Sequence, residues 1–186
     1  MPKKIAVIVG SLRKESITRK VAQELIALAP SSLAFEFVEI GALPLYNQDL
    51  EENGAAAPPE WTRFRDHVKH MDGVLFMTPE YNRSIPAPLK NAIDVGSRPY
   101  GSSVWSGKSA AIVSVSPGAI GGFGANHALR QCMVFLDMPL MQQPEAYIGN
   151  AASQLGPDGK VNNDQLKRML STIGGTFAAW VEKHSK

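Results

Sequence analysis

Apolar runs and amphipathic stretches alternate along the 186-residue chain. The apolar runs, typical of strands buried on both faces, cover residues 5–9, 33–40, 73–78 and 109–116, and a fifth strand is expected within 138–149. The amphipathic stretches predict helices over residues 17–28, 58–71, 86–95, 125–137 and 162–183. This alternation indicates a parallel sheet with right-handed crossovers.

The predicted fold is a flavodoxin-like three-layer α/β/α sandwich with a five-stranded parallel sheet in the order 2-1-3-4-5. No repeat, low-complexity tract or linker interrupts the chain, so one domain spanning residues 1–186 is expected. The segment 41–57 is rich in turn formers. It is longer than an ordinary connection between two elements, so it is expected to have a function. In such sheets a ligand binds at the carboxyl ends of the strands, so the loops after strands 1, 3 and 4 should converge.

The loop after the first strand, GSLRKES, leads directly into a helix. Free backbone N–H groups and the positive end of the helix dipole favour an anion there. Ser11, Ser16 and Thr18 can donate hydroxyl hydrogen bonds, and Arg13 a charge-assisted one. Neither a P-loop nor a dinucleotide motif follows this strand, so the loop predicts a site for the single phosphate of FMN. The alternative is that Ser11 and Ser16 only cap the helix.

The loop after the third strand, TPEYNRSIP, has the residues that a flavin ring needs. Pro79 and Pro86 stiffen it, Asn82 offers an amide to the polar edge of the ring, and Tyr81 offers a flat face. Glu80 is expected to orient the loop or the ribityl hydroxyls. The alternative is a surface loop punctuated by prolines.

The loop after the fourth strand, residues 116–124, contains four glycines that allow a ring or a phosphate to approach the backbone closely. Gly118 is the expected contact, and a flexible turn is the alternative. Arg83 is the candidate for an electrostatic role toward the NADPH phosphate or an anionic acceptor, with a solvated surface arginine as the alternative.

The strings GSLRKES, PEYNRSIPAPLKNAID and SVSPGAIGG together resemble the NADPH-dependent FMN reductase family, in its quinone/chromate-reductase branch, over residues 4–150. The resemblance implies non-covalent FMN and a homodimer or homotetramer with the flavin near the interface. It implies phosphate and ribityl contacts from Ser11, Arg13, Ser16, Ile17 and Thr18. It implies flavin contacts from Pro79, Glu80, Tyr81, Asn82 and Ser116. The chain departs from the family at two places. It has Thr18 where the family often has asparagine, and it lacks the aromatic residue that often follows the aspartate equivalent to Asp94.

The expected activity is an FMN-dependent oxidoreductase that takes two electrons from NADPH or NADH and passes them on by a ping-pong mechanism. Quinones, chromate, azo or nitro compounds and flavins are the expected acceptors. Because the flavin performs the redox chemistry, no catalytic residue is assigned. The alternative is a flavodoxin-type electron carrier without its own substrate, but the net charge of +2 lacks the acidity usual for docking of such carriers.

The composition of the chain bears on its expected partners and compartment. The lysines and arginines are scattered, which does not favour nucleic acid, and no segment reaches transmembrane length or resembles a signal peptide, so a cytoplasmic protein is expected. The single cysteine, Cys132, forms no internal disulfide and is expected in the core. His67 and His70 have no evident third ligand, so no metal is expected.

Several other residues have more than one interpretation. Trp61 and Phe64 are expected in the core. His127 is a candidate for contact with the ligand or a partner subunit. The apolar helix 125–137 is expected to be core or a dimer interface, and the segment 41–57, with Tyr46 and Asp49, to cover a neighbouring subunit's flavin.

Overall fold

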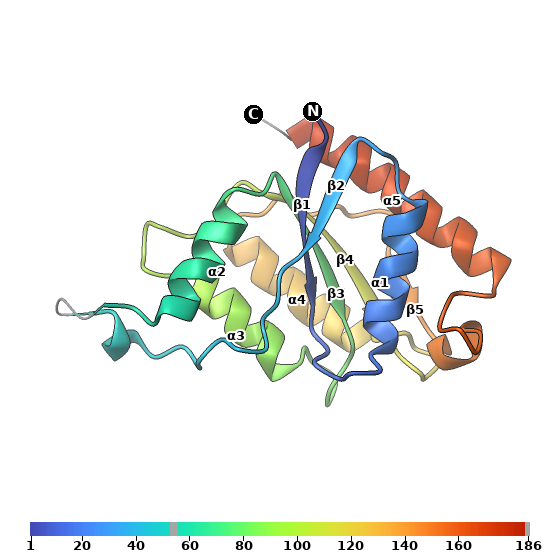
Figure 1. Ribbon diagram of the computed structural model, residues 1–186, viewed down its shortest axis with the longest axis horizontal. Helices are drawn as coiled ribbons and strands as arrows, with labels where there is room; N and C mark the ends of the chain where they lie inside the picture. Colours follow the sequence, from blue (N-terminus) through green and yellow to red (C-terminus); the bar gives the residue numbers. More distant parts are fainter. Residues whose placement is uncertain (53–55, 185–186) are drawn as a thin grey trace.

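The computed structural model describes residues 1–52 and 56–184, which form a parallel sheet covered by helices (Figure 1). The strands are β1 (Lys3–Val9), β2 (Leu33–Phe37), β3 (Gly73–Thr78), β4 (Ser109–Val115) and β5 (Ala146–Ile148). The helices are α1 (Ile17–Leu28), α2 (Pro59–Lys69), α3 (Ala87–Gly96), α4 (Phe123–Phe135) and α5 (Asp164–His184). Every strand pair is parallel and the order is β2-β1-β3-β4-β5, which confirms the predicted flavodoxin-like fold.

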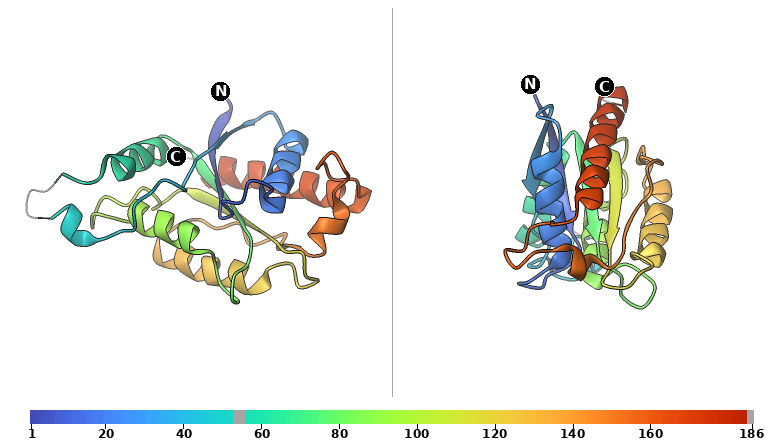
Figure 2. Two further views of the ribbon diagram at one scale, coloured as in Figure 1. Left: turned by 60° about the horizontal axis from the view of Figure 1, so that its bottom comes forward. Right: turned by 90° about the vertical axis from the view of Figure 1, so that its right-hand side faces the viewer.

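Three layers arise because successive side chains of a strand point to opposite faces of the sheet. Val7 lies on the face covered by α1 and α5, whereas Ile8 lies on the face covered by α2, α3 and α4 (Figure 2). Trp61 and Phe64 of α2 are buried in the second of these layers, as predicted. The central strands are therefore apolar on both faces, which explains their continuous apolar runs.

The predicted second strand, residues 33–40, is too long. The backbone N–H of Val38 still donates to the carbonyl of Val7 over 3.0 Å, but β2 ends at Phe37. Val38 and Ile40 then pack in the layer of α2, so their side chains are apolar because they cover the core and not because they extend the strand. The other bounds differ from the predicted ones by no more than two residues.

The long segment between β2 and α2 is fixed to the neighbouring helices, and it contains the 3-10 helix Gln48–Leu50. The Tyr46 N–H donates to Asn91 Oδ1 over 2.8 Å, and Arg65 donates to both carboxylate oxygens of Glu51 over 2.6 and 3.1 Å. Burial favours a raised pKa for Glu51, but hydrogen bonds from Arg65 and Tyr46 outweigh it and lower the pKa. Residues 53–55 of this predicted loop lie outside the described residues.

The loops after β1, β3 and β4 meet at the carboxyl edge of the sheet, the lower edge in Figure 1. Among residues 1–52 and 56–184, no helix is both long and apolar enough to cross a membrane.

Candidate functional site

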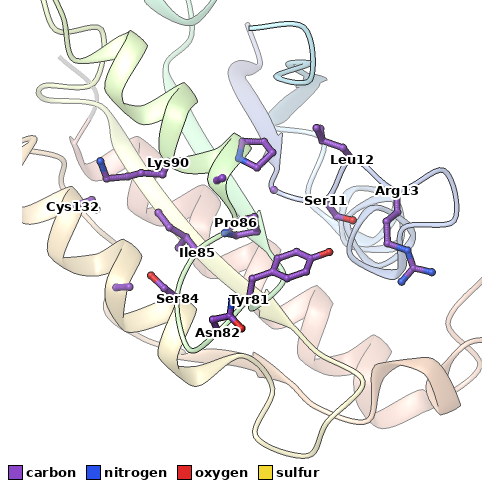
Figure 3. A pocket seen from close by; sticks show the side chains of 14 residues that line it. Ser11, Leu12, Arg13, Tyr81, Asn82, Ser84, Ile85, Pro86, Lys90 and Cys132 are labelled. Atoms are coloured by element: carbon purple, nitrogen blue, oxygen red, sulfur yellow. The ribbon is translucent and has the colours of Figure 1, made fainter. Parts of the chain in front are cut away.

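A cavity of about 960 Å³ opens at the carboxyl edge, between the loops after β1 and β3 and the helices α3 and α4. Figure 3 shows Ser11 and Arg13 at one end of it, and Lys90 and Cys132 at the other. Its lining residues are Gly10, Ser11, Leu12, Arg13, Tyr81, Asn82, Ser84, Ile85, Pro86, Ala87, Pro88, Lys90, Ala128 and Cys132. Of the predicted flavin contacts, Ser11, Arg13, Tyr81 and Asn82 line the cavity and the others do not.

The start of α1 has the features of an anion site. Ser16 is buried, and its Oγ accepts a hydrogen bond from the N–H of Arg19 over 3.1 Å, so it does cap the helix. Within the described part of the chain, the backbone N–H groups of Ile17 and Thr18 have no acceptor. Thr18 is only 3% exposed. The helix therefore presents free amides, with buried hydroxyls beside them, to an anion.

A two-residue hairpin forms the wall of the cavity after β3. Tyr81 and Ser84 exchange backbone hydrogen bonds of 3.0 and 2.9 Å, and the residues between them, Asn82 and Arg83, have φ values of 48° and 65°. Positive φ at both central positions is the geometry of the tightest hairpin turns. The ring of Tyr81 is directed toward the end of the cavity where Ser11 and Arg13 lie (Figure 3).

Glu80 lies at the base of this hairpin and does not line the cavity. Its side chain is 16% exposed, and its Oε2 accepts a hydrogen bond from the N–H of Ala125 over 3.0 Å. That amide belongs to the first turn of α4, whose N-cap, Gly122, supplies no side chain. A Cβ added to Gly124 would lie 2.7 Å from the carbonyl oxygen of Arg83, so the hairpin packs closely on α4. Glu80 therefore positions the hairpin.

The glycine-rich loop after β4 is packed against the segment that follows β5. Ser116 Oγ accepts from the N–H of Gly118 over 3.1 Å, and the Gly118 carbonyl accepts from the N–H of Asn150 over 3.2 Å. A Cβ at Gly121 would lie 2.7 Å from the backbone of Tyr147. These contacts hold the loop against the segment that follows β5, and Ser116 and Gly118 do not line the cavity.

Lys90 and Cys132 are among the cavity residues for which the sequence predicts no role at the site. Lys90 pairs with Asp94 over 2.8 Å on α3, and the helical spacing of Lys90 from Pro86 was the available signal. Cys132 was expected in the core, but it is only partly buried, because its face of α4 borders the cavity. Burial raises the pKa of its thiol.

The histidines have local partners. His127 Nε2 lies 2.8 Å from the hydroxyl of Tyr147, and the His127 ring packs on Phe123, outside the cavity lining. His67 pairs with Glu36 over 2.9 Å, and His70 Nδ1 lies 2.6 Å from the carbonyl of Asp66. Among the described residues, no group of three or more His, Cys, Asp or Glu side chains is arranged to hold a metal ion.

The sheet order, the free amides at the start of α1 and the adjoining cavity define a flavodoxin-like flavin-binding protein. The chain belongs to the NADPH-dependent FMN reductase family, whose model matches residues 3–153. It is 65% identical over 179 residues to a quinone reductase of Pseudomonas putida, covering 96% of this chain and 94% of that protein. It is 46% identical over 182 residues to a 2-hydroxy-1,4-benzoquinone reductase of a Burkholderia species, covering 97% of each.

Among solved structures, the flavoenzyme FerB, an NAD(P)H:acceptor oxidoreductase of Paracoccus denitrificans, superposes with a TM-score of 0.91. The two chains are 41% identical, and the match covers 99% of this chain and all of FerB. Family membership confirms the predicted enzyme class and its cofactors, FMN with NAD(P)H as the electron donor.

The residues present fit FMN. A phosphate needs several N–H or O–H donors and a positive charge, which the first-turn amides of α1, the hydroxyls of Ser16 and Thr18, and Arg13 supply. A planar ring needs a flat apolar contact and a polar edge, which Tyr81 and Asn82 supply at the adjoining cavity.

Proposed function

We propose that this protein passes two electrons from NAD(P)H, through FMN, to quinones, and that donor and acceptor occupy the same cavity in turn. The cavity that joins the loops after β1 and β3 is the observation that carries this proposal. The names of the relatives support quinones, since a quinone reductase and a benzoquinone reductase are 65% and 46% identical to this chain.

The chain would hold the cofactor from two sides. Ser11, Arg13, Ser16, Ile17 and Thr18 would bind its phosphate and ribityl chain, and Tyr81 and Asn82 its ring, with Pro79, Ser116 and Gly118 completing the shape of the site. Glu80 would act indirectly, because its carboxylate holds the hairpin against α4. The bound flavin supplies the two-electron redox chemistry, and the protein supplies binding and orientation.

In this proposal one planar substrate at a time stacks beside the hairpin, in the cavity of about 960 Å³. Donor and acceptor would therefore exclude one another, and no protein acid or base is required because water exchanges the protons. Arg83, 74% exposed at the tip of the hairpin, would attract anionic groups of NADPH or of the acceptor. Arg83→Ala should then raise the KM for NADPH and for anionic acceptors.

The test is steady-state oxidation of NADPH and NADH by FMN-loaded protein with a benzoquinone, chromate, an azo dye, a nitro compound and free FMN as acceptors. Turnover with the quinone and parallel double-reciprocal plots are expected. Intersecting plots, which indicate a sequential mechanism, would refute the proposal that donor and acceptor occupy the cavity in turn. Absence of turnover with every acceptor, together with electron uptake from a separate reductase, would favour the electron-carrier alternative.

We also propose that residues 1–186 act as one FMN-binding domain in the cytoplasm and assemble as a homodimer or homotetramer. Val134 and Phe135 at the end of α4 are 79% and 72% exposed, an unusual exposure for adjacent large apolar side chains. A face of this kind is typical of an interface between copies. Sedimentation of wild type and of a Val134→Lys, Phe135→Lys variant tests it, with a smaller assembly expected for the variant.

A further inference from the structure

A second cavity, of about 450 Å³, lies at the carboxyl end of β2, on the other side of the loop after β1. It is bounded by this loop, by the start of α1 and by the segment that follows β2. Its lining residues are Val7, Val9, Ser11, Leu12, Arg13, Lys14, Arg19, Phe37, Val38, Glu39 and Gly41.

The second cavity is cationic. Arg13, Lys14 and Arg19 line it together with one carboxylate, that of Glu39, and the lining keeps a net charge of +1 when Arg13 is assigned to the FMN phosphate. In the part of the chain that the structure describes, Arg13 and Lys14 form no ion pair. A phosphomonoester, which carries a charge of about −2 at neutral pH, complements this lining.

The carboxylate is held by an arginine. Arg19 donates to Glu39 over 2.5 Å, and its guanidinium lies 4.6 Å from the ring centre of Phe37. In dinucleotide-binding α/β sheets, the acidic residue after the second strand bonds the 2′-hydroxyl of the adenosine ribose, whereas an arginine accommodates a 2′-phosphate. Here Arg19 neutralises the acidic residue and is itself oriented by Phe37, so the site favours the phosphate over the hydroxyl.

The two cavities share a wall. Ser11, Leu12 and Arg13 line both of them, and Figure 3 shows these three residues at one end of the first cavity. Leu12 lies over Gly41, where an added Cβ would be 3.3 Å from the Leu12 side chain. Ser16, Ile17 and Thr18, in contrast, do not line the second cavity. A ligand that extends past Ser11, Leu12 and Arg13 would reach from the flavin site to the cationic lining. It would leave the N–H groups of Ile17 and Thr18 to the FMN phosphate.

We propose that this second cavity binds the 2′-phosphate of NADPH and makes NADPH the preferred electron donor. The inference rests on the proposed function, because it requires the nicotinamide of the donor to occupy the first cavity. Lys14 and Arg19 are then the specificity-determining residues, and neither belongs to the predicted FMN contacts.

The binding test is calorimetry on FMN-loaded protein, with adenosine 2′,5′-bisphosphate, 5′-AMP and inorganic phosphate as probes. The bisphosphate is expected to bind about tenfold more tightly than 5′-AMP, the difference that one charged hydrogen-bonded contact supplies. Lys14→Glu and Arg19→Gln should each remove most of this difference. Arg168→Glu, the same charge reversal at an exposed position of α5, should retain it.

Kinetics and flavin binding provide independent readouts. The ratio of kcat/KM for NADPH to that for NADH should fall about tenfold in Lys14→Glu, with the Kd for FMN unchanged. An unchanged ratio, or inorganic phosphate binding as tightly as the bisphosphate, would overturn the proposal. A parallel loss of FMN affinity would also overturn it, since the cavity would then belong to the cofactor phosphate. If wild type oxidises neither donor, the proposed function fails, and the binding experiment still decides what the second cavity recognises.

Discussion

Replacing Glu80 by alanine should destabilise the protein even without its cofactor, because the carboxylate caps a helix. Glu80 Oε2 accepts the N–H of Ala125 over 3.0 Å in the first turn of α4. The N-cap residue, Gly122, makes no side-chain hydrogen bond of its own. In Glu80→Ala this amide loses its acceptor in a part-buried position, and the positive end of the helix dipole loses a neighbouring negative charge.

Two contributions set the size of the effect. A side-chain cap at a helix N-terminus contributes about 0.5–2 kcal/mol, and a charge near the dipole about 0.3–1 kcal/mol. At 16% exposure the Glu80 carboxylate is only partly screened, so Glu80→Ala should lower the free energy of unfolding by about 2 kcal/mol. Glu80→Gln keeps an acceptor oxygen and should lose about half of that. For a domain of this size, the melting temperature should fall by about 4–8 °C in the alanine variant.

Urea unfolding of the apoprotein, followed by circular dichroism, measures this loss, and fluorescence titration gives the Kd for FMN separately. The matched control is Glu24→Ala on α1, which is expected to change the free energy of unfolding by less than about 0.5 kcal/mol. Equal free energies of unfolding for Glu80→Ala and Glu24→Ala would refute the capping role of Glu80. A weaker FMN affinity with unchanged apoprotein stability would instead indicate that Glu80 contacts the flavin directly.

Four further substitutions test other parts of the structure. Arg83→Gly should raise the free energy of unfolding by about 1 kcal/mol in urea, because φ is 65° at this position, whereas Arg83→Ala should not. Gly124→Ala should destabilise by about 1–3 kcal/mol, since its Cβ would lie 2.7 Å from the Arg83 carbonyl oxygen; a wild-type melting temperature would refute that packing. Glu51→Gln should cost about 3 kcal/mol at pH 7, because it breaks a pair with Arg65 whose side chains are 8% and 12% exposed. Because the folded-state pKa of Glu51 is lowered, this contribution is present above its ordinary pKa of 4.5 and is lost as pH falls, so wild type and variant should converge in acid unfolding. Thr18→Val should weaken FMN binding about tenfold with apoprotein stability unchanged, whereas Thr18→Ser should retain the affinity; equal titrations for both would exclude a hydroxyl contact.

The sheet was predictable because its central strands are buried on both faces. The runs at 73–78 and 109–115 are mostly apolar and are buried at every position, a pattern typical of strands covered on both faces. The end of β2 was not predictable in this way. Val38 and Ile40 are apolar because they cover the layer of α2, and a single sequence does not distinguish apolar residues that pair with a neighbouring strand from those that only pack.

The site was predictable as a set of loops, but not as a set of contacts. Ser11, Arg13, Tyr81 and Asn82 do line one cavity, because the carboxyl ends of β1 and β3 are neighbours in the sheet. The partner of Glu80 lies 45 residues further along the chain, and no local pattern reveals it. Cys132 has the helical spacing of a core residue, but its face of α4 borders the cavity.

The cap formed by Ser16 does not compete with a phosphate site at the same helix. A serine hydroxyl accepts and donates at once, so Ser16 Oγ can accept the N–H of Arg19 while its own proton remains available to an anion. What separates ordinary capping from anion binding is the remaining first-turn amides. Those of Ile17 and Thr18 have no acceptor within residues 1–52 and 56–184, and Thr18 is almost fully buried beside them. A helix that only needed a cap would leave such amides to water, whereas here buried hydroxyls adjoin them, which favours an anion as their partner.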